Sequence, residues 1–178
     1  MYKVVAYIYE LAASITQRYS NKRKMRQWLN NKYGTNFSED DLKNVKDFSL
    51  IWNVFENSIC GNNFSIQRFQ QDITNRNIDV NMFESHLSYF KNRYLENETF
   101  TNRFRYLYFR TNDRKELVER VLLGTDTDPN NIILAITIIV YRFRNNLFHG
   151  LKEMQNIDQQ NQNFEVANSF LTILIDKF

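Results

Sequence analysis

The feature that most restricts the fold is an apolar run, IILAITIIVY, from Ile132 to Tyr141. Asp128 and Pro129 precede it, and these residue types cap and begin helices, so a helix is expected to start there. Because the run is apolar on every side of such a helix, the helix needs neighbours all round it. The run is about half the length that a bilayer crossing requires, so no membrane span is expected. The sequence therefore predicts a central helix surrounded by other helices.

The overall composition also favours helices. A chain of 178 residues suits one domain, and its 43% hydrophobic content is enough for one well-filled core. Four glycines and one proline leave little material for hairpin turns or tight loops between strands and helices. We therefore predict an all-α protein in which residues 1–178 form a single-domain helical bundle of about six to seven helices.

The spacing of apolar residues places the remaining helices. They are expected at about residues 2–31, 38–61, 80–95, 98–110, 113–123 and 163–178, and residues 61–79 form either a loop or a short helix around 66–73. Ser38 followed three residues later by Asp41 is a capping-box pattern, so Glu39, Asp40 and Asp41 are interpreted as first-turn residues. His86 lies among apolar neighbours, which is typical of a packed residue.

Cysteine usage and the N-terminus bear on the compartment. The single cysteine, Cys60, cannot form an intrachain disulfide, and its surroundings show no Cys or His spacing typical of zinc sites. The N-terminal run YKVVAYIYELAAS is interrupted by Glu10 and precedes the basic cluster, unlike a signal peptide. We expect a cytoplasmic protein that has no cofactor, no metal and no contact with a membrane.

Basic residues gather in two segments, although the net charge is only +3. The segment RYSNKRKMRQW, Arg18 to Trp28, holds five basic residues and no acid, and RFRYLYFRTNDRK, Arg103 to Lys115, interleaves arginines with aromatic residues. Each segment is either a solvated helix face or a surface that follows a phosphate backbone. The candidate RNA contacts in these segments are Arg18, Lys22, Arg23, Lys24, Arg26 and Arg105.

The end of the central helix is unexpectedly polar. It reads RFRNNLFHG, Arg142 to Gly150, and contains one of only two histidines in the chain. A histidine can act as general base or acid near neutral pH, and a guanidinium can bind two phosphate oxygens at once. Together they can accelerate RNA cleavage by attack of a 2'-hydroxyl on the adjacent phosphorus. The alternative is a polar helix end in which the side chains satisfy free carbonyls and Gly150 stops the helix.

The stretch RNNLFHG, Arg144 to Gly150, with its flanking helices, resembles the Arg-x4-His motif of the HEPN domains, particularly the Apea-like and abortive-infection-type branches. The resemblance implies a metal-independent endoribonuclease that serves as a toxin or antiviral (abortive infection) effector, with a composite active site at a homodimer interface. It carries catalytic roles onto Arg144 and His149, with Asn145 as the polar residue after the arginine. It also implies RNA as substrate and an antitoxin or regulatory protein as a further partner.

Helix geometry complicates this assignment. At 100° per residue, Arg144 lies about 140° from His149, whereas Arg142, Asn145 and Asn146 lie within about 60° of it. Either the helix loosens before His149, or Arg144 reaches round, or the histidine of a second protomer meets it. Arg142 and Asn146 are then candidates for further RNA contacts. The alternative function is a non-catalytic HEPN-like module that binds RNA, a nucleotide or another protein.

Overall fold

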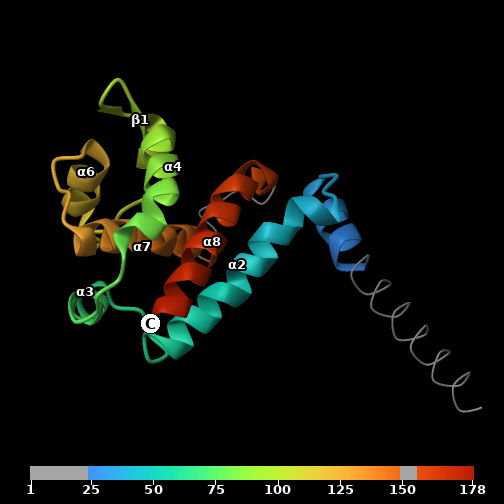
Figure 1. The fold of residues 1–178 in the computed structure, drawn as a ribbon. Helices are drawn as coiled ribbons and strands as arrows, with labels where there is room; N and C mark the ends of the chain where they lie inside the picture. The colour runs from blue at the N-terminus through green and yellow to red at the C-terminus, as the bar shows by residue number, and fades with distance from the viewer. Residues whose placement is uncertain (1–23, 149–155) are drawn as a thin grey trace, which may run out of the picture.

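The computed structural model describes residues 24–148 and 156–178, which are mainly helical. The helices are α2 (Glu39–Ser58), α3 (Ile66–Thr74), α4 (Glu84–Tyr94), α5 (Asn102–Arg105), α6 (Lys115–Leu123), α7 (Pro129–Phe148) and α8 (Asn161–Lys177), and residues 24–33 are also helical. Short 3-10 helices η1 (Val80–Phe83) and η3 (Asp158–Gln160) precede α4 and α8, and strands β1 (Leu95–Glu96) and β2 (Thr99–Phe100) pair as an antiparallel hairpin. The predicted all-α bundle is confirmed (Figure 1).

Helix α7 is the central element, as the apolar run predicted. Every side chain from 133 to 140 is buried. Helices α3, α4 and α6 pack against it. On other sides, the ring of Tyr141 lies 5.9 Å from that of Trp52 in α2, and the ring of Phe143 lies 6.3 Å from that of Phe164 in α8. The burial of apolar surface around α7 is therefore the main stabilising contribution that the arrangement provides.

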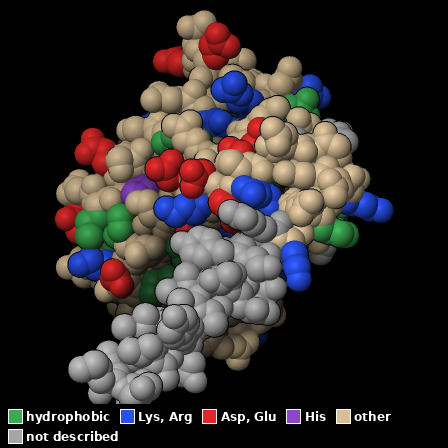
Figure 2. Space-filling model, turned by 90° about the vertical axis from the view of Figure 1, so that its right-hand side faces the viewer, with side chains coloured by type: hydrophobic (Ala, Val, Ile, Leu, Met, Phe, Trp, Pro, Cys, Tyr) green, Lys and Arg blue, Asp and Glu red, His purple; other side chains and the backbone are tan. Residues whose placement is uncertain are grey.

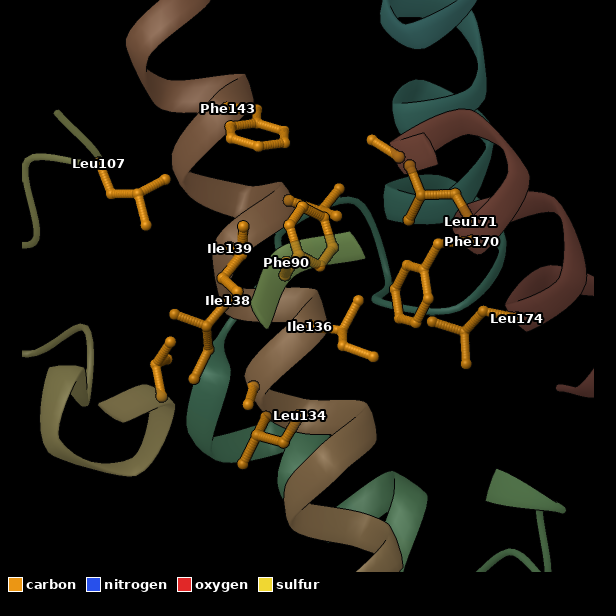
Figure 3. Packing of buried hydrophobic residues seen from close by; sticks show 14 of the residues in the cluster. Phe90, Leu107, Leu134, Ile136, Ile138, Ile139, Phe143, Phe170, Leu171 and Leu174 are labelled. Atoms are coloured by element: carbon orange, nitrogen blue, oxygen red, sulfur yellow. The ribbon is translucent and has the colours of Figure 1, made fainter. Parts of the chain in front are cut away.

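Helices α2 and α8 lie side by side and run in the same direction (Figure 1). Near their first turns, the Asn44 side-chain amide donates to the Asn161 carbonyl at 3.5 Å, and the Asn168 amide donates to the Asn44 carbonyl at 3.0 Å. The side chains of Phe170, Leu171 and Leu174 extend from α8 toward the centre of the bundle (Figure 3). The pair thus covers one flank of α7.

Capping residues place several helix boundaries where the sequence predicted them. The Ser38 hydroxyl accepts from the Asp41 N–H, and an Asp41 carboxylate oxygen accepts from the Ser38 N–H, so the capping box of α2 is present. The Asp128 carboxylate accepts from the Asn131 N–H at 3.0 Å at the start of α7. The segment around 66–73 is a helix, α3. Most of the helix predicted over 2–31 lies outside the described residues, apart from its helical end.

The helix predicted over 98–110 is wrong. Asn97 and Glu98 adopt positive φ angles of 49° and 60° and turn the chain into the β1–β2 hairpin. A short α5 follows, and the chain to residue 110 is irregular. Phe100 and Phe104 have the spacing of helix neighbours, but their rings stack at 4.3 Å across the end of the hairpin. Burial of these rings therefore decided the local structure against helix propensity.

None of the helices in 24–148 and 156–178 combines the length and apolar character that a membrane crossing requires.

Candidate functional site

The polar end of α7 carries two arginines, and Arg142 is completely buried. Its Nη1 lies 2.8 Å from Oδ2 of Asp113, and its Nε donates to the Leu107 carbonyl at 2.9 Å. Its Nη2 donates to Oδ1 of Asn146 at 3.4 Å. Burial lowers the pKa of Arg142, and the adjacent Asp113 carboxylate partly opposes that effect. A buried charge needs compensating partners, and Asp113 and Leu107 from the segment before α6 provide them together with Asn146 of α7.

Asn146, one turn after Arg142, extends the same network. Its Nδ2 donates to the Tyr106 carbonyl at 3.1 Å and to the Leu107 carbonyl at 3.3 Å. The Asp113 carboxylate also accepts from the Arg110 N–H at 2.7 Å. Figure 3 shows Leu107 reaching from its loop toward α7. The buried polar side chains of α7 therefore fix the irregular segment 106–113 against the helix.

This network changes the interpretation of two residues predicted as RNA contacts. Arg142 and Asn146 both lie inside the protein, and their side chains bond to the 106–113 segment. A phosphate at the protein surface has no access to either side chain in this arrangement. Their observed contribution is to position the loop that carries Tyr106 and Tyr108.

Arg144 faces another side of α7 and keeps contact with solvent, with 30% of its side chain exposed. Its Nη1 donates to Oδ1 of Asn145 at 3.2 Å, and its guanidinium carbon lies 5.4 Å from the centre of the Phe148 ring. Arg144 Nε and Asn145 Nδ2 are buried and have no hydrogen-bond partner among the described residues. Asn145 is therefore in a position to orient the guanidinium of Arg144.

Glu56 of α2 is a neighbour of Arg144 that no local sequence pattern predicted. Its Oε2 lies 3.9 Å from Arg144 Nη2, beyond hydrogen-bond distance. The same carboxylate accepts from Trp52 Nε1 at 3.0 Å and from the Phe64 N–H at 3.1 Å. Glu56 is thus held by its own helix and the following loop, and it places a fixed negative charge beside Arg144. The pair depends on how α2 crosses α7, which no local pattern encodes.

Several predicted site residues lie outside the described residues: His149, Arg18, Lys22 and Arg23. Of the described members of the N-terminal basic segment, Lys24 is exposed and Arg26 lies 3.9 Å from Glu39. Arg105 is exposed on α5. On the face shown in Figure 2, Lys and Arg side chains are mixed with Asp and Glu and form no continuous basic band.

A cleft of about 670 Å³ is lined by basic, aromatic and amide side chains. Arg93 of α4 and Arg103 of α5 contribute to it, together with Tyr94 and the loop residues Tyr106 and Tyr108. Side-chain amides of η3 and the first turn of α8 complete the lining, and none of the described residues that line the cleft carries a carboxylate. The sequence indicated the aromatic and basic character of 103–115, but the contributions from α4 and η3 come from distant parts of the chain.

Comparison of the chain with protein-family models, with curated proteins and with solved structures found no match. The resemblance to HEPN domains therefore rests on the motif alone. No group of three or more His, Cys, Asp or Glu side chains is arranged to hold a metal ion within residues 24–148 and 156–178.

Proposed function

We propose that the protein is a metal-independent endoribonuclease of the HEPN type, a toxin or antiviral (abortive infection) effector, with Arg144 and His149 in an active site that a second copy of the chain completes. The observation that carries the proposal is the placement of Arg144. Of the two arginines near the end of α7, it is the one whose guanidinium reaches solvent, and Asn145 bonds to it.

The proposed reaction is an internal transesterification. The 2'-oxygen of RNA attacks the adjacent phosphorus while a general base removes its proton, and the bond from phosphorus to the 5'-oxygen breaks while a general acid protonates that oxygen. The products are a 2',3'-cyclic phosphate and a 5'-hydroxyl. Arg144 binds the non-bridging oxygens and stabilises their growing charge. Two histidines, one His149 from each copy, divide the base and acid roles across a two-fold axis.

The contacts of Arg144 are compatible with binding a phosphate. A partly exposed ion pair such as that with Glu56 contributes about 0–1 kcal/mol. A charge-assisted hydrogen bond to a phosphate contributes about 1.5–3 kcal/mol, and a guanidinium can form two of them. The phosphate therefore competes successfully with Glu56 for Arg144. Glu56 then keeps the side chain near its binding position when no substrate is present.

The second candidate function is a non-catalytic HEPN-like module that binds RNA, a nucleotide or another protein. The cleft lined by Arg93, Arg103, Tyr106 and Tyr108 favours it, because binding there does not depend on His149. This function predicts RNA binding without turnover, so a cleavage assay separates the two.

The test uses the full chain as wild type, Arg144→Ala and His149→Ala, with mixed cellular RNA in EDTA and detection of cyclic phosphate at the fragment ends. Loss of the general acid-base histidine is expected to reduce the rate on the order of 100-fold to 10,000-fold. Arg68→Ala is the matched control, because Arg68 is an exposed arginine on α3 and does not belong to the motif. Circular dichroism and light scattering check folding and assembly of each variant.

Wild-type cleavage that both substitutions abolish, while Arg68→Ala cleaves normally, supports the proposal. No cleavage by a folded dimer, or equal cleavage by all variants, rejects the catalytic role and favours the binding module. Cleavage that EDTA abolishes and Mg²⁺ restores contradicts a metal-independent mechanism.

A further inference from the structure

We infer that the cleft between α4, the 106–108 loop and η3 is a binding subsite for one nucleotide of single-stranded RNA, separate from the cleavage point. Arg93 and Arg103 take the phosphate, and Tyr106 and Tyr108 take the base. The inference rests on the proposed function in one respect, the choice of RNA as the source of the nucleotide. The cleft and the motif meet on α7, where Phe143 lines the cleft and Arg144 is the next residue.

The charges of the cleft select an anion. Some cations of the described residues have acidic neighbours, including Lys46 with Glu39 and Lys115 with Glu119. Arg93 and Arg103 form no ion pair with a carboxylate in the described part of the chain, and no carboxylate lines the cleft beside them. Two arginines without a counter-charge in one concave surface raise the local concentration of anions.

Arg93 also has hydrogen-bonding capacity left over. Its side chain lies beside the hydroxyls of Tyr89 and Tyr94, which hold it in place. Its Nε is buried and has no hydrogen-bond partner among residues 24–148 and 156–178. A buried N–H donor without an acceptor is unfavourable, and an arginine donor fits the geometry of a phosphate oxygen.

The aromatic side of the cleft is preorganised. Tyr106 and Tyr108 are 61% and 46% exposed, and the centres of their rings lie 6.2 Å apart. Leu107 between them is buried against α7, so the two tyrosine side chains face solvent while the leucine side chain faces the core. Tyr108 adopts a left-handed φ of 51°, which is unusual for a bulky side chain and persists only where the surroundings impose it.

The buried network of α7 is what imposes this loop conformation. Asn146 bonds to the Tyr106 carbonyl, and Arg142 bonds to the Leu107 carbonyl. The tyrosine backbone is therefore fixed before any ligand arrives, and a fixed aromatic surface loses little conformational entropy when a base stacks on it. This gives Arg142 and Asn146 a part in RNA binding, although they do not touch RNA.

The shape and the remaining lining fit a nucleotide. A volume of about 670 Å³ lies in the usual range of ligand sites, about 300–1,000 Å³. The exposed amide side chain of Gln159 adds a polar group of the kind that recognises base edges. A free mononucleotide has the same chemistry as one unit of RNA, so the experiment includes both sources.

The test measures binding by fluorescence anisotropy with a labelled, mixed-sequence 2'-O-methyl RNA of about 12 nucleotides, within the usual span of single-strand sites. Without a free 2'-hydroxyl the probe cannot be cut by the proposed reaction, so binding is read independently of cleavage. The full-chain variants are Arg103→Gln, Tyr106→Ala and the conservative Tyr106→Phe. Arg68→Gln is the matched control, because Arg68 is an exposed arginine on α3 and does not line the cleft. AMP is titrated as the free nucleotide.

Tyr106→Ala is expected to weaken binding roughly 5-fold to 100-fold, the usual range for loss of one stacked base, whereas Tyr106→Phe retains the affinity. Arg103→Gln should weaken binding and reduce the salt dependence of log K by about 0.7, the value for one phosphate contact to a single strand. Arg68→Gln should bind like the wild type. Equal thermal unfolding of the variants shows that these changes are not folding defects.

If Arg103→Gln and Tyr106→Ala bind the RNA probe with the affinity of the wild type, the subsite is overturned. The proposed ribonuclease is not affected by that result. Binding of AMP but not of the oligomer overturns RNA as the source, and binding of neither overturns the site. A protein that binds RNA through the cleft but cuts no RNA in EDTA rejects the proposed cleavage and keeps the subsite. The two proposals therefore fail separately.

Discussion

Arg142 and Arg144 are two residues apart on α7, and the protein uses them in opposite ways. Arg142 is fully buried and bonded to Asp113, Leu107 and Asn146. Arg144 is partly exposed, and its only carboxylate neighbour in the described residues, Glu56, is 3.9 Å away. Two residues correspond to about 200° of rotation on a helix, so the side chains point to nearly opposite sides.

The difference shows that surroundings, and not residue type, decide what a polar helix end does. On the Arg142 side, an irregular segment offers a carboxylate and two carbonyl acceptors. The buried guanidinium therefore connects α7 to the 106–113 segment. On the Arg144 side, one fixed carboxylate and an aromatic ring leave the guanidinium open to an additional anion. One helix end thus combines a rigid support and an accessible cation.

The largest expected effect comes from removing the partner of Arg142. Asp113→Ala leaves a guanidinium buried without its counter-charge, and breaking a buried pair in this way costs about 3–5 kcal/mol of unfolding free energy. Chemical denaturation of the wild type and the variant measures the loss. The double variant Asp113→Ala/Arg142→Met removes the unpaired charge and should recover part of the stability. A loss below about 1 kcal/mol from Asp113→Ala would show that the Arg142–Asp113 pair is not important for stability.

A smaller effect is expected from Asn146→Ala. This change removes the hydrogen bond to the Tyr106 carbonyl, while the Leu107 carbonyl keeps its bond from Arg142. It also leaves Arg142 Nη2 without its acceptor in the interior, and an unsatisfied buried polar group costs about 1–3 kcal/mol. In this variant, backbone hydrogen exchange should accelerate more in residues 106–110 than in α2. Asn53→Ala, at an exposed position of α2, is the control. Equal exchange rates of residues 106–110 in both variants would show that Asn146 does not hold the loop in place.

Arg144→Ala tests the accessible arginine in the same way. Because its ion pair is long and partly exposed, the substitution should change the unfolding free energy by less than about 1 kcal/mol. Denaturation under the same conditions as for Asp113→Ala provides the measurement. A loss as large as that of Asp113→Ala would make Arg144 a structural residue too and remove the contrast between the two arginines.

Local patterns were sufficient to predict much of the fold. The Ser38–Asp41 capping box and the Asp128–Pro129 start are encoded within a few residues, and both appear where expected. The apolar run correctly placed α7 at the centre. The region 98–110 was predicted wrongly because its aromatic spacing suits a helix, whereas the chain turns at Asn97 and stacks Phe100 on Phe104.

The candidate site was less predictable, because its contacts join distant segments. The burial of Arg142 depends on Asp113, which belongs to the segment before α6. The partner of Arg144, Glu56, comes from α2, and the cleft collects side chains from α4, α5 and η3. The motif RNNLFHG marked the relevant helix end but did not distinguish the buried arginine from the accessible one. That distinction is a tertiary property.

The smallest predicted effect concerns His86, which extends the contrast between buried and accessible groups to the histidines. His86 is 5% exposed, its ring lies near those of Phe83 and Phe170, and its Nε2 is 3.2 Å from the Ser169 hydroxyl. Burial lowers its pKa below the ordinary value of 6.5, so the folded protein favours the neutral ring. The unfolded chain binds the proton more readily, and the stability from this group is therefore present above pH 6.5 and lost as the pH falls below it. From about pH 7.5 to about pH 5.5, the unfolding free energy should fall more for the wild type than for His86→Gln. An equal fall in both proteins would assign the pH dependence to other groups.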